Sequence, residues 1–164
     1  MGRHNITFRP ISDNDMDFLY RVYASTREEE LSLLDWDEAQ KEAFLQLQFQ
    51  AQHKHYQEYF PDASFDIIIW KNRPVGRLYI HRRPDEIRLV DIALLPQYRR
   101  RGLGSQLLKK ILAEGEAAGL PVRIHVEQNN PALILYTQLG FRHIEDQGVY
   151  YLMEWEPSTI NNPV

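Results

Sequence analysis

The chain lacks cysteine, and it lacks any long apolar run. With no Cys among its 164 residues, disulfides, thiolate metal sites and a cysteine nucleophile are excluded. No apolar stretch is long enough to predict a membrane-spanning helix. Residues 1–5 lead directly into a strand-like segment, which is not the pattern of a signal peptide. We therefore expect a cytoplasmic protein that contacts no membrane.

An excess of positive charge is also absent. The formal net charge is −4, which argues against general binding to nucleic acid. The basic run Arg99–Arg101 is too short to change that expectation. The six histidines include His53 and His55, but a spacing of two does not place both on one face of a helix. No metal site is therefore predicted.

The length and composition of the chain fit one globular domain, since 43% of the residues are apolar and a chain of this size can bury a substantial core. Apolar periodicity predicts strands at residues 6–9, 65–71, 75–82, 87–95, 122–126, 141–146 and 149–155. It predicts helices from Ser12 or Asp13 to about residue 34, from Asp35 or Asp37 to about 59, and over 102–118 and 131–139. Turns are expected at 61–62, 72–74, 84–85, 119–121 and 147–148.

This order of elements predicts the fold class. Strands alternate with helices, and antiparallel hairpins lie toward both ends of the chain. Such an arrangement is typical of an α/β fold with a central mixed β-sheet flanked by helices. We expect the domain to cover residues 6–156. The C-terminal tail, 157–164, has no periodicity and is expected to be loose.

The stretch Arg99–Ser105 is the most informative part of the sequence. It follows the apolar run 89–95 and precedes an amphipathic segment with apolar residues at Leu103, Leu107, Leu108, Ile111 and Leu112. A glycine-rich turn at a helix N-terminus presents free backbone N–H groups to an anion. Arginines add charge and fork-shaped donors. The stretch therefore predicts a phosphate or pyrophosphate site, although its glycine spacing matches neither a Rossmann fingerprint nor a P-loop.

A second segment, residues 129–141, predicts a helix followed by a turn and a strand. Asn129 can cap the helix, and Pro131 suits its first turn. Gly140 is placed to end the helix in a left-handed conformation. One helical face carries Ala132, Leu135 and Tyr136. On its own, this segment is explained equally well by a purely structural role.

Taken together, the two segments resemble a known family. Arg99, Gly102 and Gly104 fit motif A of the GNAT superfamily, the acetyl-CoA-dependent N-acetyltransferases, written [Q/R]-x-x-G-x-[G/A]. The second segment fits the family pattern N-x-x-A-x-x-[L/F]-Y-x-x-x-G-F through Asn129, Ala132, Leu135, Tyr136, Gly140 and Phe141. The resemblance covers roughly residues 8–155, and its specific part is 91–141. It implies a GNAT-like fold.

The resemblance also implies an activity and a binding site. The activity is transfer of an acetyl group from acetyl-CoA to a primary amine, by direct attack through a tetrahedral intermediate, with no metal. The residues implied for the coenzyme A pyrophosphate are Arg99, Arg100, Arg101, Gly102, Leu103, Gly104 and Ser105. The backbone around Ile92, Ala93 and Leu94 would contact the pantetheine arm and the oxyanion, although these could also be plain core residues.

Two further residues have an implied role and an open alternative. Tyr136 would be the general acid that protonates the leaving thiolate, since an unperturbed phenol with a pKa of about 10 is protonated at neutral pH; the alternative is a core tyrosine. Asn129 would bond the pantetheine arm or a strand carbonyl; the alternative is a helix cap.

The general base is less clear. Many family members carry Glu or His on the motif A strand, but the corresponding positions here include Arg88 and Val90, which cannot serve. Asp91 is the only carboxylate of that strand, and an acid in an apolar run must be hydrogen-bonded, ion-paired or protonated. We take Asp91 and Glu127 as the catalytic candidates for this base and His125 as a third candidate. A structural role for Asp91 and a water relay both remain open.

The acceptor is expected to be a small-molecule amine or a peptide, and a homodimer is one option for the assembly. Recognition is expected from the first helices and the final hairpin, although a charge run is usually a solvated face. The candidates there are Arg27, Glu28, Glu29, Glu30, Trp36, Phe49, His53, Tyr56, Tyr150 and Tyr151. The alternative function is a non-catalytic acyl-CoA-binding or sensor module with the same fold.

Overall fold

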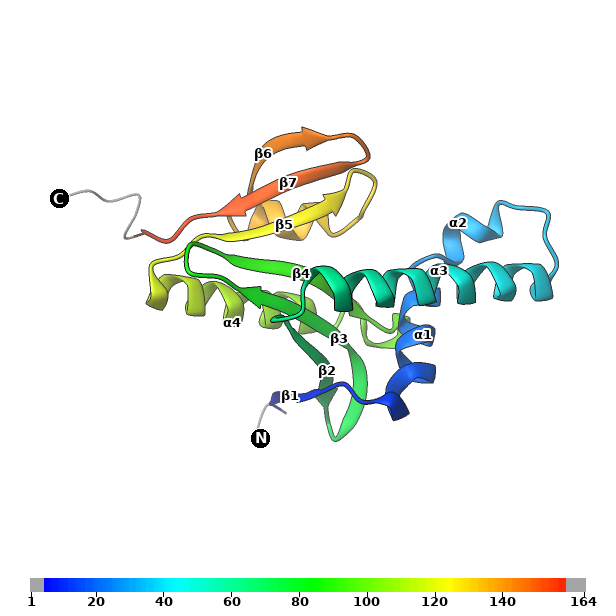
Figure 1. The fold of residues 1–164 in the computed structure, drawn as a ribbon. Helices are drawn as coiled ribbons and strands as arrows, with labels where there is room; N and C mark the ends of the chain where they lie inside the picture. The colour runs from blue at the N-terminus through cyan, green and yellow to red at the C-terminus, as the bar shows by residue number, and fades with distance from the viewer. Residues whose placement is uncertain (1–4, 159–164) are drawn as a thin grey trace. The chain divides into compact units, whose positions relative to one another are not determined.

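The computed structural model describes residues 5–158, which form two compact units. The first consists of residues 5–79 and 92–99, and the second of residues 80–91 and 100–158. Figure 1 shows the elements of both. Within residues 5–158, no helix combines the length and the apolar character needed to cross a bilayer.

The first unit begins with strand β1 (Ile6–Pro10), which pairs antiparallel with β2 (Ser64–Trp70). Between them lie the short 3-10 turn η1 (Asp13–Asp15) and the helices α1 (Met16–Ser25), α2 (Glu28–Ser32) and α3 (Glu38–Tyr59). The predicted start of α3 is confirmed, because the Asp37 side chain accepts a hydrogen bond from the Gln40 amide at 2.8 Å. Such a cap satisfies an amide that has no partner inside the helix.

The three helices of this unit share one apolar core. It includes Leu19 and Val22 of α1, Leu31 of α2 and Phe49 of α3. Leu95, which follows the strand β4 (Ile87–Leu94), belongs to the same core, and Ala93 packs against it. The core therefore fixes the end of β4, the strand that precedes motif A, relative to the three helices.

The second unit contains α4 (Leu103–Ala118), β5 (Val122–Glu127), α5 (Leu133–Gln138) and the hairpin of β6 (Arg142–Gln147) and β7 (Tyr150–Trp155). The apolar face predicted for α4 is confirmed, because its periodic leucines and isoleucine are buried: Leu103, Leu107, Leu108, Ile111 and Leu112. Strand β5 pairs parallel with β4, from Ile87 opposite Val122 to Leu89 opposite Ile124. It pairs antiparallel with β7.

The fold class predicted from the sequence is confirmed. The hydrogen-bonded order of the strands is β1-β2-β3-β4-β5-β7-β6, where β3 covers Arg73–Arg82. The sheet is mixed, because its pairs include a parallel one (β4 with β5) and antiparallel ones (β1 with β2, β5 with β7, β6 with β7).

The single helix predicted from about residue 12 to residue 34 is wrong. The chain forms a 3-10 turn and two helices, with a break after Ser25. The hydroxyls of Ser25 and Thr26 donate to the carbonyls of Val22 and Tyr23, at 2.7 and 2.6 Å. Such local bonds occupy carbonyls of the last turn and compete with continuation of the helix.

Two predicted boundaries were also wrong. The β2–β3 turn is formed by Lys71 and Asn72, with φ of 52° and 61°, rather than by residues 72–74. Two left-handed residues suit the right-handed twist of a hairpin. Helix α5 begins at Leu133 rather than at residue 131, because the Asn130 side chain holds the Ala132 amide at 2.9 Å in a turn before the helix. Most of the tail 157–164 lies outside the described residues.

Candidate acetyl-CoA site

The loop that enters α4 has two residues with left-handed backbone, Arg100 (φ 61°) and Gly102 (φ 79°). The first bond inside the helix runs from the Gln106 amide to the Gly102 carbonyl at 3.0 Å. The amides of residues 103–105 therefore have no intrahelical acceptor, which is the geometry of an anion site. A Cβ atom at Gly104 would meet only the Leu135 side chain, at 3.8 Å. A ligand atom next to Gly104 would thus meet no backbone from another element.

Arg99, in the first unit, holds the end of β4. Its Nε donates to the Leu94 carbonyl at 2.9 Å, and one Nη donates to the Ser25 hydroxyl at 3.1 Å. A guanidinium has five N–H donors, so two bonds leave others for a ligand. Arg99 therefore joins the end of the motif A strand to the end of α1.

Gly76 of β3 is a residue of this region that the sequence analysis did not single out. A Cβ atom at this position would overlap the carbonyl oxygen of Ala93, so β3 can approach β4 here only without a side chain. The signal was available, because a glycine inside a strand pattern often marks a close backbone approach. Gly76 thus sets the position of the backbone that the resemblance assigns to the thioester.

Tyr136 lies on α5 and is only 4% exposed. Its ring meets that of Phe141 edge to face, with centroids 5.5 Å apart. Burial raises the pKa of the Tyr136 phenol, and the charge of Asp91 raises the pKa further. The structure therefore brings these two candidates within electrostatic reach of each other, and the phenol keeps its proton at neutral pH.

The other candidates of the second unit lie around the end of β5. Glu127 is the last residue of that strand and stands opposite Tyr150 of β7. Its carbonyl accepts a bond from the Asn130 amide at 3.0 Å. Asn129 lies in this connection and is exposed. The helix-capping alternative for Asn129 is wrong. The side chain that accepts a hydrogen bond from a backbone amide before α5 is that of Asn130, and the amide is that of Ala132.

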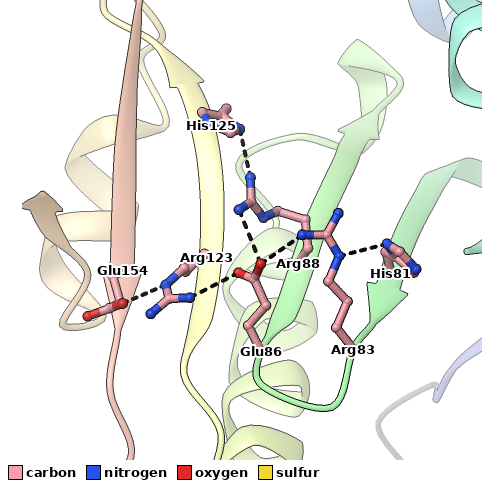
Figure 2. A network of polar contacts seen from close by, with 7 residues as sticks. All are labelled: His81, Arg83, Glu86, Arg88, Arg123, His125 and Glu154. Carbon is pink, nitrogen blue, oxygen red and sulfur yellow. Dashed lines mark hydrogen bonds and ion pairs between the residues drawn. The ribbon is translucent and has the colours of Figure 1, made fainter. Parts of the chain in front are cut away.

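His125 belongs to a network of polar contacts shown in Figure 2. Arg88 lies 2.9 Å from His125, Nη1 to Nδ1. Because a guanidinium only donates, Nδ1 must accept, so its lone pair is occupied. Burial lowers the pKa of His125, and the charge of Arg88 lowers the pKa further, while a hydrogen bond with Gln147 opposes them. His125 is thus a neutral ring whose Nδ1 is not available as a base.

The centre of the same network is Glu86, which is 4% exposed. Its carboxylate contacts Arg83 at 2.8 Å, Arg88 at 3.3 Å and Arg123 at 3.5 Å, and Arg123 also holds Glu154 at 2.6 Å (Figure 2). Burial alone would raise the pKa of Glu86, but the hydrogen bonds and charges of the arginines lower it overall. Arg88, at a position where the resemblance led us to look for a base, is thus an ion-pair partner of a buried acid.

The candidates for acceptor recognition differ in exposure. Phe49 is a core residue at 2% exposed, and His53 stacks on its ring with centroids 6.0 Å apart. Trp36 and Tyr150 are 38% and 42% exposed, so both can meet a partner. In the described part of the chain, no group of His, Asp and Glu side chains is arranged to hold a metal ion.

Solved structures share this fold. The PaiA N-acetyltransferase of Thermoplasma acidophilum, crystallised in complex with coenzyme A, superposes with a TM-score of 0.69 over 93% of this chain and 99% of that one. The two sequences are 18% identical, so this likeness concerns the fold alone.

Curated relatives are similar over part of the chain. A [ribosomal protein bS18]-alanine N-acetyltransferase of Haemophilus influenzae is 31% identical over 85 residues, which are 51% of this chain and 58% of the relative. An N-alpha-acetyltransferase of Sulfurisphaera tokodaii is 39% identical over 69 residues, 38% of this chain and 40% of the relative. The aligned part thus covers about half the length of these relatives.

The family model for GNAT acetyltransferases matches residues 20–141, which include the loop before α4, Tyr136 and the three candidate bases. The match spans most of the chain and contains both segments that carry the resemblance in the sequence. The chain therefore belongs to the acetyltransferase (GNAT) family.

Proposed function

We propose that this chain transfers the acetyl group of acetyl-CoA to a primary amine. The observation that carries the proposal is the left-handed loop Arg100–Gly102, which leaves the amides of residues 103–105 free at the start of α4. In a member of the GNAT family, a pyrophosphate is the anion that such a loop is best suited to bind. We assign the activity to a domain of residues 6–156.

The loop and the strand before it would hold acetyl-CoA. The amides of Leu103, Gly104 and Ser105 bind the pyrophosphate, and Arg100 and Arg101 supply positive charge beside them. Backbone groups of Ile92, Ala93 and Leu94 hold the pantetheine arm and donate to the oxyanion. Asn129 bonds the pantetheine arm from the connection after β5, and Arg99 keeps the end of β4 in place.

The reaction is a direct attack of the amine nitrogen on the thioester carbon. The nitrogen loses a proton to Asp91 or Glu127, directly or through water, and a tetrahedral intermediate forms with its oxyanion on backbone donors. When the intermediate collapses, the C–S bond breaks and the coenzyme A thiolate leaves. Tyr136 donates a proton to the sulfur as charge develops there, since a phenol is protonated at neutral pH.

The partial relatives favour the amino terminus of a polypeptide as the acceptor, since one carries the name of a bS18-alanine N-acetyltransferase and the other that of an N-alpha-acetyltransferase. One observation favours a non-catalytic acyl-CoA-binding module instead. Arg88 contacts Glu86 and His125, so a position where the resemblance led us to look for a base holds an ion pair.

A thiol-release assay separates these functions. The protein is incubated with acetyl-CoA and a panel of small amines, amino acids and peptides with a free amino terminus, and the released coenzyme A is measured. We expect release that depends on one class of amine. Binding of acetyl-CoA without release above the rate in buffer would support the non-catalytic module.

The pyrophosphate assignment is tested by Gly104→Glu. A carboxylate beside the free amides repels a phosphate and fills the open space, so the affinity for acetyl-CoA should fall roughly tenfold or more. Calorimetry measures the affinity, with Gln106→Glu as the matched control, because it adds the same charge to an exposed residue of the same helical turn. Equal affinities for the two variants would remove the pyrophosphate from this loop.

A further inference from the structure

The segment 28–47, which we name the α2–α3 lobe, has several large apolar side chains that are exposed to solvent. Leu33 and Leu47 are 84% and 69% exposed, and Leu34, Trp36 and Phe44 are each about two-fifths exposed. Every residue from 32 to 40 is exposed. Single exposed apolar side chains are common, but here five lie within 20 residues, and two of them, Trp36 and Phe44, meet edge to face with ring centroids 5.3 Å apart, as in a candidate interaction surface.

The same lobe concentrates negative charge. Among residues 28–47 there are seven acidic side chains and one basic one, Lys41, so the net charge is −6, whereas the entire chain carries −4. The one partner of Lys41 that the structure shows is Glu38, at 3.8 Å, and most of the acids lie on exposed positions. An apolar surface with an acidic surround is complementary to a partner that is both apolar and cationic.

The chemistry of the lobe excludes other classes of partner. Nucleic acids and the anionic lipids of a membrane surface would meet charge of the same sign. A second copy docked by the same surface would bring two charges of −6 together, which electrostatic complementarity disfavours. A small amine would cover too little of the apolar area. What fits is a polypeptide segment with Arg or Lys beside Leu or aromatic residues.

The lobe is tied to the strand expected to hold the thioester. Leu31 of α2 lies in the same apolar core as Leu95, and Ala93 packs against that core. Arg99 bonds both the Leu94 carbonyl and Ser25, three residues before α2. A polypeptide bound on the lobe would therefore be anchored to the element that presents the acetyl group.

We propose that the α2–α3 lobe binds a basic, apolar segment of the acceptor, and hence that the acceptor is a cationic polypeptide rather than a small amine. The bound polypeptide is an acceptor only if the proposed acetyl transfer takes place, but its binding to the lobe can be measured without turnover. The binding should weaken as the ionic strength rises to about 0.15 M, because exposed charges are then screened.

The test is direct binding of short fluorescent peptides with a free amino terminus, measured by anisotropy. One peptide alternates Arg with Leu and Phe, a second replaces Arg by Glu, and a third replaces the apolar residues by Ser. We expect the first to bind at least about tenfold more tightly than the others. Two lobe variants, Leu33→Ser/Leu47→Ser and Asp35→Asn/Glu38→Gln, should each reduce that affinity several-fold.

The matched control is Glu58→Gln/Tyr59→Ser, which removes an exposed acid and an exposed ring at the other end of the same helix. It should bind the basic peptide like the wild type, and melting curves check that all variants fold. Equal affinity for the three peptides, or equal losses in lobe and control variants, would overturn the inference. Selective binding with no acetylation of the bound peptide would instead count against the proposed function alone.

Discussion

The second unit contains two groups of titratable side chains: buried acids paired with arginines, and Asp91 beside the buried phenol of Tyr136. At the start of the parallel pair β4 and β5, Glu86 and Glu154 are neutralised by arginines at 2.6–3.5 Å. Near the middle of β4, Asp91 interacts with the phenol of Tyr136: burial raises the pKa of that phenol, and the charge of Asp91 raises it further. The first group consists of ion pairs around buried acids and suits a structural role, whereas the second pairs a candidate base with a candidate general acid and suits chemistry. The comparison predicts that variants of the two groups fail in different ways.

Tyr136→Phe should have the largest effect on turnover. The change removes the proton donor and keeps the ring on Phe141, so kcat should fall by about 100-fold while the affinity for acetyl-CoA stays the same. Steady-state kinetics and calorimetry measure the two quantities. Because burial and Asp91 raise the phenol pKa, the shape of the pH–rate profile below about pH 10 should not change.

The control for Tyr136→Phe is Tyr23→Phe, which removes a hydroxyl from another buried tyrosine, in the core of the first unit. Its kcat should stay close to that of the wild type. An unchanged rate constant for the chemical step in Tyr136→Phe would assign Tyr136 to the core.

Asp91→Asn should have the next largest effect, because it keeps the size of the side chain and removes the charge that would attract a protonated amine. We expect kcat/KM for the amine to fall by about tenfold, with acetyl-CoA binding unchanged. Glu127→Gln is measured beside it, and the larger loss identifies the group nearer the amine. A lower melting temperature with wild-type kinetics would show that Asp91 is a structural acid.

The two groups were not equally visible in the sequence. Local patterns were sufficient for the starts of α3 at Asp37 and of α4 after Gly102, because a helix cap or a glycine turn involves near neighbours in the chain. The roles of the loop before α4 and of Tyr136 stay predictions. The network was not foreseen, since Glu86, Arg123 and Glu154 are far apart in the sequence and meet only through strand pairing. The contact between Arg88 and His125 was not foreseen for the same reason, since the two residues are 37 positions apart.

Errors in the fold had a different origin. The break after Ser25 depends on two hydroxyls that bond to backbone carbonyls, and the same residues are compatible with a continuing helix. The left-handed Lys71 has no sequence signal of its own, unlike the Asn beside it. Local propensities were nearly balanced at both places, so bonds and packing that the sequence does not specify decided the outcome.

Glu86→Gln should affect stability and leave turnover within about twofold of the wild type. Removing the charge of a buried acid leaves its arginines partly uncompensated, which costs about 3 kcal/mol in the free energy of unfolding, measured in urea. Since the pKa of Glu86 is lowered by folding, its charge stabilises the fold above the unfolded pKa of about 4.3. The difference between wild type and variant should therefore shrink as the pH falls below about 4. A large loss of kcat with unchanged stability would place Glu86 among the groups that support catalysis.

His125→Gln should have the smallest effect on turnover, and it sharpens the comparison most. Arg88 occupies Nδ1, so kcat/KM should match the wild type from about pH 6 to 9, the span in which a histidine base would titrate. Folding lowers the pKa of His125 through burial and the charge of Arg88. The neutral ring therefore stabilises the fold above the unfolded pKa of about 6.5, and this contribution is lost as the pH falls through the lower folded value.

Between about pH 7 and pH 5, the melting temperature of the wild type should fall more steeply than that of His125→Gln, which has no ring to protonate beside Arg88. If the acid limb of the pH–rate profile disappeared in the variant instead, His125 would be a base, and the two groups of charges would belong to one site.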